Sequence, residues 1–281
     1  MTLFFIGIIL YVLLNINNDK KLVNQLENSL KLTKNLLEEE KRYALSLSIL
    51  ISEDKEFLEA YTRGNREATF NIVNQKIDTL KKLQNSSFEV QVHNQDLHTF
   101  IRSWDFSIKD IPLSSFRQGL VKVKATQKPL VSIELGKRLN IKAISPLIKN
   151  NQFIGSLEVI IGFEHLENEL KQRGLDTYIL LHNQYLNIAN TLNKNQKNKE
   201  YTLVNDMSKN VDFLKDINMN EFKDYGYFTN DDWAFSYFTY YSLKREKLGY
   251  LLISSQNSSH LKINNAFENK IINSNTRIII E

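Results

Sequence analysis

Charged and aromatic side chains with the chemistry of a small binding pocket recur between residues 101 and 158. They are Arg102, Trp104 and Asp105 in the run IRSWD, Arg117 in FRQG, Glu134 in IELG and Lys142 in IKAISP. Arginine and lysine donate charge-assisted hydrogen bonds to anions, whereas a glutamate holds an amine or fixes a neighbouring cation. A tryptophan supplies an apolar wall or stacks on a cation. Together these residue types suit a small charged or zwitterionic metabolite.

The same residues also fit a structural role, and the sequence leaves both interpretations open. Arg102 or Arg117 could form an ion pair with Glu134 or Asp105 and so tie a helix to a sheet. A buried arginine without a partner is costly, so buried cations here need either an acidic side chain or a ligand. Trp104 fits a hydrophobic core at least as well as a pocket wall.

Other kinds of chemistry find little support. The chain has no Cys, which excludes disulfides, thiolate metal sites and a cysteine nucleophile. Its five histidines show no metal-ligand spacing, and we interpret His93 and His98 as a surface pair on a hairpin. No glycine-rich phosphate loop, nucleophile elbow or Ser-His-Asp order is present. We therefore predict no enzyme, no metal and no cofactor; a hydrolase acting through Glu134 or Glu158 is the weakest alternative.

Composition predicts an ordinary folded chain. Its 281 residues are 42% hydrophobic and 24% charged, which is enough to bury a core in one large or two modest domains. The formal net charge of +4 comes from 36 basic and 32 acidic residues spread along the sequence. Such a distribution gives little attraction for a polyanion, so we predict no nucleic-acid partner.

The first residues are almost wholly apolar. Residues 3–14 read LFFIGIILYVLL, which is shorter than the roughly 20 residues that a membrane-spanning helix needs. No Lys or Arg precedes this run and no small-residue cleavage site follows it, so a cleaved signal peptide fits poorly. We interpret residues 1–16 as an uncleaved membrane anchor that lacks its first turns; the alternative is a buried core helix.

Residues 17–84 predict a long amphipathic helix. Apolar residues recur at helical spacing from Leu22 onwards, and the stretch contains no Pro. Gly64 and Asn65 predict a break. A helix of this length lets two copies of the chain pack side by side as a homodimer; alternatively, its apolar stripe covers the globular part of its own chain.

Residues 85–166 predict an α+β unit. Strands are expected at 88–92, 98–104, 130–135, 141–148 and 153–163, with a helix capped by Ser114 or Ser115 and running to about residue 126. The order is strand, strand, helix, then three strands. Short antiparallel strands with one inserted helix give a sheet that is covered on one face.

Residues 167–256 predict a weaker repeat of the same order. After a helical connector at 164–174, we expect a hairpin of strands 178–181 and 185–189, a helical segment at 204–217, and strands at 225–228, 233–241 and 248–254. The aromatic run at 233–241 indicates the core of this second unit. Residues 257–281 predict an exit helix.

The stretches that carry charge resemble the double Cache sensor family, in the subtype with a long N-terminal helix that occurs in bacterial chemoreceptors, sensor histidine kinases and diguanylate cyclases. The resemblance lies in IRSWD at 101–105, FR at 116–117, KP at 128–129, IELG at 133–136, IKAISP at 141–146 and IGSLE at 154–158. It covers about residues 20–275. Ser132 stands where the family often has Gly, and Lys142 where it often has Arg, so charge is kept there but bidentate geometry is lost.

This resemblance implies two tandem PAS-like Cache modules, with residues 85–166 distal and residues 167–256 proximal to a bacterial cell membrane. It further implies a periplasmic or extracellular sensory region in which Arg102, Trp104, Asp105, Arg117, Glu134 and Lys142 bind a small molecule between the distal sheet and its loops. Signalling would pass through the helices across the membrane, with chemotaxis as the preferred output. The alternatives are a histidine kinase or diguanylate cyclase sensor, and a dimerisation module that binds a partner protein without any small-molecule ligand.

Overall fold

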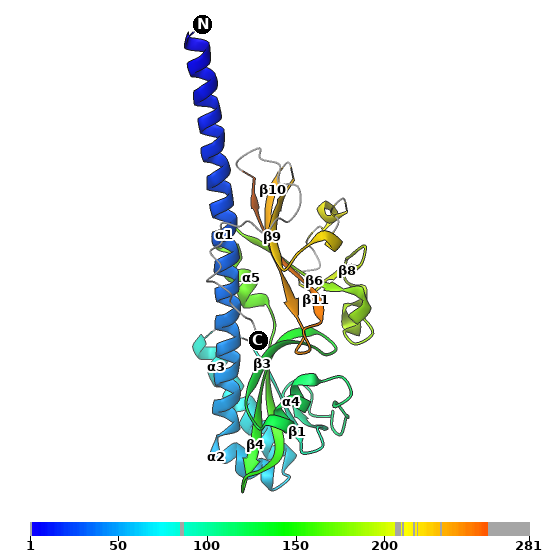
Figure 1. The fold of residues 1–281 in the computed structure, drawn as a ribbon. Coiled ribbons are helices and arrows are strands. Elements are labelled where there is room, and N and C mark those ends of the chain that lie inside the picture. The colour runs from blue at the N-terminus through cyan, green and yellow to red at the C-terminus, as the bar shows by residue number, and fades with distance from the viewer. Residues whose placement is uncertain are drawn as a thin grey trace.

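One helix runs along the length of the molecule, and both sheets lie beside it (Figure 1). The computed structural model describes residues 2–84, 87–205, 209, 211–215, 217, 219–230 and 232–257. In helix α1 (Thr2–Ser52), buried leucines recur four or seven positions apart, which places them on one face: Leu22, Leu26, Leu30 and Leu37. Among the described helices none has an apolar stretch long enough to cross a membrane. The anchor over residues 1–16 therefore stays a prediction.

Two breaks interrupt the long helical segment, giving α1, α2 (Lys55–Thr62) and α3 (Arg66–Gln84). Gly64 adopts φ +69° between α2 and α3, which confirms the predicted break at a residue that tolerates left-handed backbone. The break after α1 was not predicted. There Asp54 caps α2 by accepting a hydrogen bond of 2.9 Å from the backbone N–H of Phe57.

The first sheet is antiparallel with strand order β2-β1-β5-β4-β3. Its strands are β1 (Glu89–Asn94), β2 (Thr99–Arg102), β3 (Leu130–Leu135), β4 (Leu139–Lys149) and β5 (Gln152–Ile161), and helix α4 (Gln118–Thr126) connects β2 to β3. The predicted α+β class and element order are confirmed. Helix α4 begins later than predicted: Arg117 occupies its N-cap, so neither Ser114 nor Ser115 caps it.

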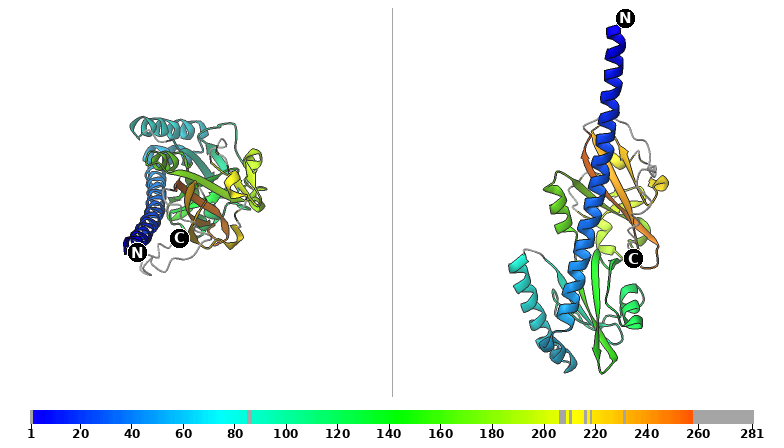
Figure 2. Two further views of the ribbon diagram at one scale, coloured as in Figure 1. Left: turned by 90° about the horizontal axis from the view of Figure 1, so that it is seen from above. Right: turned by 60° about the vertical axis from the view of Figure 1, so that its left-hand side comes forward.

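Alternation along these strands gives the first sheet two different faces. Apolar residues on one face, among them Val92, Ala143 and Leu157, join the core that contains the α1 leucines. Ser48 of α1 also shares a hydrogen bond of 2.9 Å with Ser145 of β4. Figure 2 shows α1 and α4 on opposite sides of this sheet. The face toward α4 carries the polar residues and, beside them, a small apolar cluster that includes Leu120 and Val123 of α4 and Ile144 of β4.

Helix α5 (Glu164–Lys171) leads into a second antiparallel sheet with strand order β7-β8-β6-β11-β10-β9. Its strands are β6 (Asp176–His182), β7 (Lys197–Asn198), β8 (Tyr201–Leu203), β9 (Tyr225–Thr229), β10 (Trp233–Tyr241) and β11 (Lys247–Gln256). One face packs on α1, where Ser29 and Ser236 share a hydrogen bond of 3.0 Å. The other face forms a separate core rich in aromatic rings, which include Phe235, Tyr237 and Tyr250. The interior of the aromatic run at 233–241 is therefore core, as predicted, whereas its ends, Trp233 and Tyr241, are exposed.

Two predictions for this second unit are wrong. Residues 185–189 form no strand: short 3-10 turns lie at Asn183–Tyr185 and Asn190–Lys194, and β8 pairs with β6 instead. In the described part of 204–217, the helical residues are a single 3-10 turn, Asp212–Leu214. Asn-rich segments favour such turns because their side chains compete for backbone hydrogen bonds. The predicted exit helix lies outside the described residues except for Asn257.

Candidate functional site

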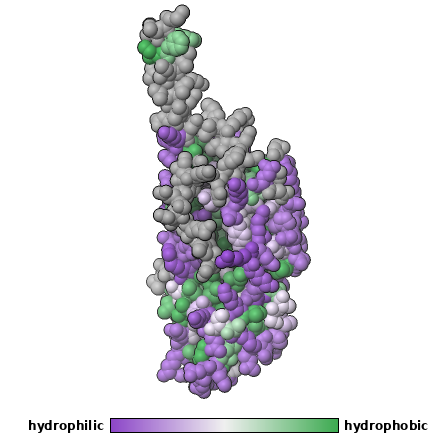
Figure 3. Space-filling view, in the orientation of Figure 1, coloured by the Kyte–Doolittle hydropathy of each residue, from purple (hydrophilic) through white to green (hydrophobic). Residues whose placement is uncertain are grey.

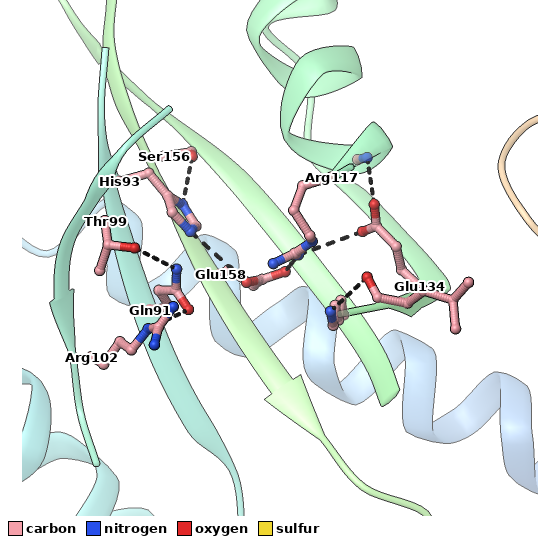
Figure 4. Close-up of polar contacts among 11 residues, drawn as sticks. Gln91, His93, Thr99, Arg102, Arg117, Glu134, Ser156 and Glu158 are labelled. Atoms are coloured by element: carbon pink, nitrogen blue, oxygen red, sulfur yellow. Dashed lines mark hydrogen bonds and ion pairs between the residues drawn. The ribbon is translucent and has the colours of Figure 1, made fainter. Parts of the chain in front are cut away.

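A polar cluster lies on the α4 side of the first sheet and contains Gln91, His93, Ser132, Glu134, Lys142, Ser156 and Glu158 (Figure 4). Antiparallel register brings these side chains together, because Gln91 pairs with Glu158 and His93 with Ser156 across β1 and β5. All seven side chains are buried. A buried polar cluster of this size is unusual for a face that a helix covers, since most such faces are apolar.

Arg117 ties α4 to the sheet through two carboxylates. Its Nη2 atom bonds to Glu158 and lies 3.6 Å from Oε2 of Glu134. The other oxygen of Glu134 accepts a hydrogen bond of 2.8 Å from the backbone N–H of Gly119, in the first turn of α4. Burial alone would lower the pKa of Arg117, but Glu158 and then Glu134 raise it above its usual value. The structural ion pair of Arg117 with Glu134 is therefore present, with Glu158 as an additional partner.

Lys142 has no comparable partner. It is 3% exposed, and its Nζ donates one hydrogen bond of 3.2 Å to the backbone carbonyl of Leu135. Among the described residues no carboxylate oxygen lies within the 4.0 Å of an ion pair with it. Burial, reinforced by the positive charge of Arg117, lowers the pKa of Lys142 to about 8. The cluster therefore contains a buried cation that is only weakly compensated.

Arg102, Trp104 and Asp105 lie at the edge of this cluster. Arg102 is half-buried, and its Nε donates a hydrogen bond of 3.2 Å to Oε1 of Gln91. Its guanidinium carbon lies 5.6 Å from the ring centroid of Trp104. Trp104 is 42% exposed, so it is a surface residue and not part of the core. Asp105 is exposed and accepts hydrogen bonds from the backbone and hydroxyl of Ser107. These bonds lower the pKa of Asp105, and its carboxylate forms no ion pair with Arg102.

The surface beside the cluster is partly apolar. Figure 3 shows hydrophobic side chains gathered on the half of the molecule that holds the first sheet. Exposed residues there include Trp104, Phe106, Phe116 and Val121, all from α4 or the loop that precedes it. Arg66 of α3 holds this loop by donating hydrogen bonds to the carbonyls of Phe106 and Ile108. An amphipathic cover of this kind suits the mouth of a small-molecule site.

The interpretation of His93 as a surface residue is wrong. His93 is fully buried, and its Nδ1 lies 3.0 Å from Oγ of Ser156. Its Nε2 lies 3.9 Å from Oε2 of Glu158. Burial, followed by the charges of Arg117 and Arg102, holds the pKa of His93 well below its usual value. His93 therefore enters the cluster as a neutral imidazole.

The cluster retains unused hydrogen-bonding capacity. Five buried atoms of the cluster and of Arg117 have no hydrogen-bond partner in the described part of the chain: Nε of Arg117, Nε2 of His93, Oγ of Ser132 and Oε2 of both Glu134 and Glu158. Each such atom carries a desolvation cost that a bound group could offset. Among the same residues no group of three or more His, Asp or Glu side chains could hold a metal ion.

Comparison with known families decides what kind of domain this is. The dCache_3 family model, described as the double sensory domain of two-component sensor kinase, matches residues 19–260. This match covers most of the chain. The chain belongs to the dCache_3 family. The predicted double Cache sensor is therefore confirmed, and the domain is sensory, not catalytic.

Solved structures with the same fold include sensors with different outputs. The extracellular domain of a protein described as a histidine kinase, vpHK1S-Z8, matches with TM-score 0.55 and 15% identity, covering 87% of this chain and 95% of its own. A domain described as a sensory box/GGDEF family protein from Vibrio parahaemolyticus matches with TM-score 0.55 and 14% identity, covering 86% and 99%. The ligand-binding domain of the Campylobacter jejuni chemoreceptor Tlp3, in complex with L-valine, matches with TM-score 0.50 and 14% identity, covering 88% and 97%. At these identities the likeness establishes the fold alone. No curated protein sequence matches the chain.

Within the dCache_3 domain, the structure brings together three of the six sequence-predicted site residues: Arg117, Glu134 and Lys142. Arg102 and Trp104 lie at the cluster's edge, and Asp105 faces solvent. Sequence reasoning missed His93 and did not place Glu158 in the site. Extending the predicted strand at 88–92 by one residue would have put His93 on the polar face, because alternate residues share a face.

Proposed function

We propose that this dCache_3 domain is the extracytoplasmic sensory region of a bacterial transmembrane receptor, and that it binds a small charged or zwitterionic metabolite at the polar cluster. The observation that carries this proposal is Lys142. Keeping an ammonium group buried with one backbone hydrogen bond and no ion pair costs several kcal/mol. An anionic ligand group would supply the missing partner.

The surrounding charges support a ligand with both signs of charge. Arg102 is a second cation without an ion pair in the described part of the chain, and Trp104 lies beside it. Glu134 and Glu158 each keep one carboxylate oxygen without a hydrogen bond, and these oxygens could accept an ammonium group. The Tlp3 domain of the same fold was solved with a zwitterion, L-valine. We therefore place amino acids first among the candidate ligands.

Calorimetry and thermal-shift assays of the chain against amino acids, small carboxylates, amines and purines test this proposal. A ligand at 100 times its dissociation constant adds about 2.7 kcal/mol to the free energy of unfolding. We expect one class to bind the wild type and to lose binding in Lys142→Met, whereas the exposed Lys244→Met serves as the matched control. Wild-type binding by Lys142→Met would refute the site. A folded chain that binds none of these compounds would favour the partner-protein alternative.

We propose that the signal reaches the membrane through α1. This helix touches both sheets through the serine pairs Ser48–Ser145 and Ser29–Ser236. A ligand that prefers one arrangement of the first sheet would therefore shift α1 relative to the second. In this proposal residues 85–166 form the distal module and residues 167–256 the proximal module. Residues 1–16 belong to the anchor in the cell membrane, and the sensory part is periplasmic or extracellular.

For the output we propose chemotaxis, with a two-component kinase as the second candidate because the description of the matching family favours it. Membranes from cells that express the complete gene separate the two candidates. Autophosphorylation from ATP that changes with ligand identifies a kinase. Ligand-dependent methylation without autophosphorylation identifies a chemoreceptor.

We also propose that two copies pair through α1. Leu36, Tyr43 and Leu50 recur along the helix at seven-residue spacing; Leu36 and Tyr43 are partly buried against the core of their own chain, whereas Leu50 is 67% exposed. Sedimentation of the chain at increasing concentration tests this pairing. Leu50→Glu should shift the equilibrium to monomer, whereas Arg42→Glu, which alters charge beside the seam, should shift it less. A wild type that stays monomeric at all concentrations would rule the pairing out.

A further inference from the structure

A cavity of about 270 Å³ lies at the junction of the two units, next to the polar cluster: Asn140 pairs with Glu134 across β3 and β4, and Ile160 pairs with Lys142 across β4 and β5. None of the six sequence-predicted site residues lines it. The first unit contributes Phe88, Asn140 and Ile160, whereas α5 and the second unit contribute Glu164, Leu192 and Asn205. Beside it, Thr191 donates to the carbonyl of Lys137 and so links the two units. We call this space the junction cavity; a molecule bound there would contact both units.

The walls of the junction cavity are half polar and half apolar, with an excess of acidic over basic residues. Phe88, Ile160 and Leu192 are buried apolar residues on its surface. Three carboxylates, Glu89, Glu164 and Glu167, line it against two cations, Lys81 and Arg138. Such a lining attracts a cation that also has an apolar body.

The three carboxylates are not equally occupied. Glu89 forms an ion pair with Arg138. Oε2 of Glu167 accepts a hydrogen bond of 2.8 Å from the side-chain amide of Asn205 and lies 3.6 Å from Nζ of Lys209. Glu164 is an exposed residue and forms no ion pair with any described residue, so its carboxylate is free to pair with a bound cation. The unmatched negative charge is therefore on the first turn of α5, at Glu164.

Asn140 offers a polar group to the junction cavity. It is 9% exposed and lines the cavity, and its side-chain amide forms no hydrogen bond with any described residue. Neither polar atom of this amide is among the fully buried atoms that lack a partner. The Asn140 amide is therefore open to a bound molecule.

We propose that the junction cavity binds a small primary amine with a compact apolar body. The ammonium group pairs with Glu164, the body lies against Phe88 and Leu192, and Asn140 bonds to a polar group of the ligand. The volume is near the lower end of the roughly 300–1,000 Å³ of small-molecule sites, which suits a compact ligand. This site goes beyond the proposed ligand site at the polar cluster and does not depend on it.

Isobutylamine and phenethylamine, with isobutyrate and phenylacetate as anionic counterparts, are suitable probes for calorimetry and ligand-observed NMR on the whole chain. We expect both amines to bind and both acids to fail. Glu164→Gln should weaken amine binding about tenfold, the value of one charge-assisted hydrogen bond. Asn140→Leu, which makes the cavity apolar, should weaken it as well. Glu169→Gln, on the same helix and paired with Arg173, is the matched control and should bind like the wild type.

Lys142→Met separates the junction cavity from the polar cluster. If the amines bind at the junction, their affinity persists in Lys142→Met and falls in Glu164→Gln. The reverse pattern would place the amines at the cluster and overturn the junction site. Failure of both amines to bind at millimolar concentration, or equal binding by Glu164→Gln, would also overturn it and leave water as the occupant. Loss of amino-acid binding in Lys142→Met concerns the proposed function alone.

Discussion

Both sheets pack one face on α1, but they bury opposite chemistry on the other face. In the first sheet that face carries Arg117, Glu134, Lys142 and Glu158, with α4 above it. In the second sheet it carries stacked rings, among them Phe228 and Phe235 with centroids 4.6 Å apart. The corresponding face therefore combines charged side chains with a small apolar cluster that includes Leu120 and Ile144 in the first unit, and carries aromatic rings in the second.

The difference separates stability from function. Burying aromatic rings stabilises a fold through the apolar area removed from water. Burying charges does not, because desolvation offsets most of the attraction between them. The second sheet shows that an uncharged face is compatible with this arrangement of strands. The buried charges of the first sheet are therefore not needed for stability, which supports the proposal of a ligand site in the first unit. Substitutions in the two faces should therefore differ in sign and in how they are rescued.

The largest effect is expected for Arg117→Ala. The substitution leaves Glu134 and Glu158 buried without their cation, and breaking a buried pair in this way costs about 3–5 kcal/mol. Urea unfolding followed by circular dichroism measures the loss. Arg138→Ala removes an exposed arginine from a surface pair with Glu89 and should cost less than about 1 kcal/mol.

Rescue distinguishes the charged face from the aromatic face in this experiment. Adding Glu134→Gln and Glu158→Gln to Arg117→Ala removes the stranded charges and should restore part of the stability. Phe235→Ala should cost a similar 3–5 kcal/mol through its cavity, and the same two glutamines should leave that loss unchanged. If they rescued both variants equally, the contrast between the faces would be lost.

A gain of stability is expected for Lys142→Met. Burial lowers the pKa of Lys142 to about 8 from 10.5. At 1.36 kcal/mol per pKa unit, removing this charge should raise the free energy of unfolding at pH 7 by up to roughly 3 kcal/mol. The isosteric change Leu252→Met in the aromatic face should instead cost less than about 1.5 kcal/mol. Destabilisation by Lys142→Met would mean that the lysine serves the fold.

The difference in the free energy of unfolding between the wild type and Lys142→Met depends on pH with a definite sign. Because the folded state releases the Lys142 proton near pH 8 and the unfolded chain near 10.5, the unfolded state binds more protons between these values. The free energy of unfolding of the wild type should therefore rise with pH across that window relative to Lys142→Met. Denaturant titrations at pH 7, 8.5 and 10 measure the converging difference.

The sequence predicts those features of the two sheet faces that produce a periodic or a charged pattern of residues. Strand alternation predicts the sheets and the aromatic core at 233–241, because packing preserves a period of two. Charge at Arg117, Glu134 and Lys142 predicts a polar site. Periodicity does not predict which cation pairs with which acid, since pairing depends on cross-strand register and on where α4 begins. Glu158 and His93 were therefore missed as partners.

The second unit was less predictable for a related reason. Its segment from Asn183 to Asn198 contains many Asn and Lys residues and follows no regular period, so short turns replaced the predicted strand at 185–189. Side-chain hydrogen bonds between residues far apart in the sequence help to decide such segments; for example, the hydroxyl of Thr202 donates a hydrogen bond of 2.6 Å to Oδ1 of Asn183. Contacts of this kind are set by the tertiary structure and leave no periodic pattern in the sequence.

A smaller, pH-dependent effect is expected at His93. Burial and the charge of Arg117 hold the pKa of His93 well below 6.5, so its neutral form stabilises the fold fully above about pH 6.5. That stability is lost as pH falls, because the unfolded chain takes up the proton first. His93→Gln keeps a polar side chain and should flatten the acid side of the stability profile. His98→Gln, at a partly exposed histidine that forms no ion pair with any described residue, is the control in the same assay, and equal flattening by both would refute the assignment.

The smallest effect is expected for Asp105→Asn, which tests the edge of the charged face. The carboxylate is exposed and bonds to Ser107 in its own loop, so its removal should leave unfolding unchanged within error. Ligand affinity should also stay close to the wild-type value, whereas Arg102→Met, which removes a half-buried cation beside Trp104, should weaken it. Calorimetry with the ligand identified for the wild type compares the two variants. A larger loss in Asp105→Asn would move the binding site outward from the buried cluster to the loop, and the contrast between the two sheet faces would then no longer explain where the ligand binds.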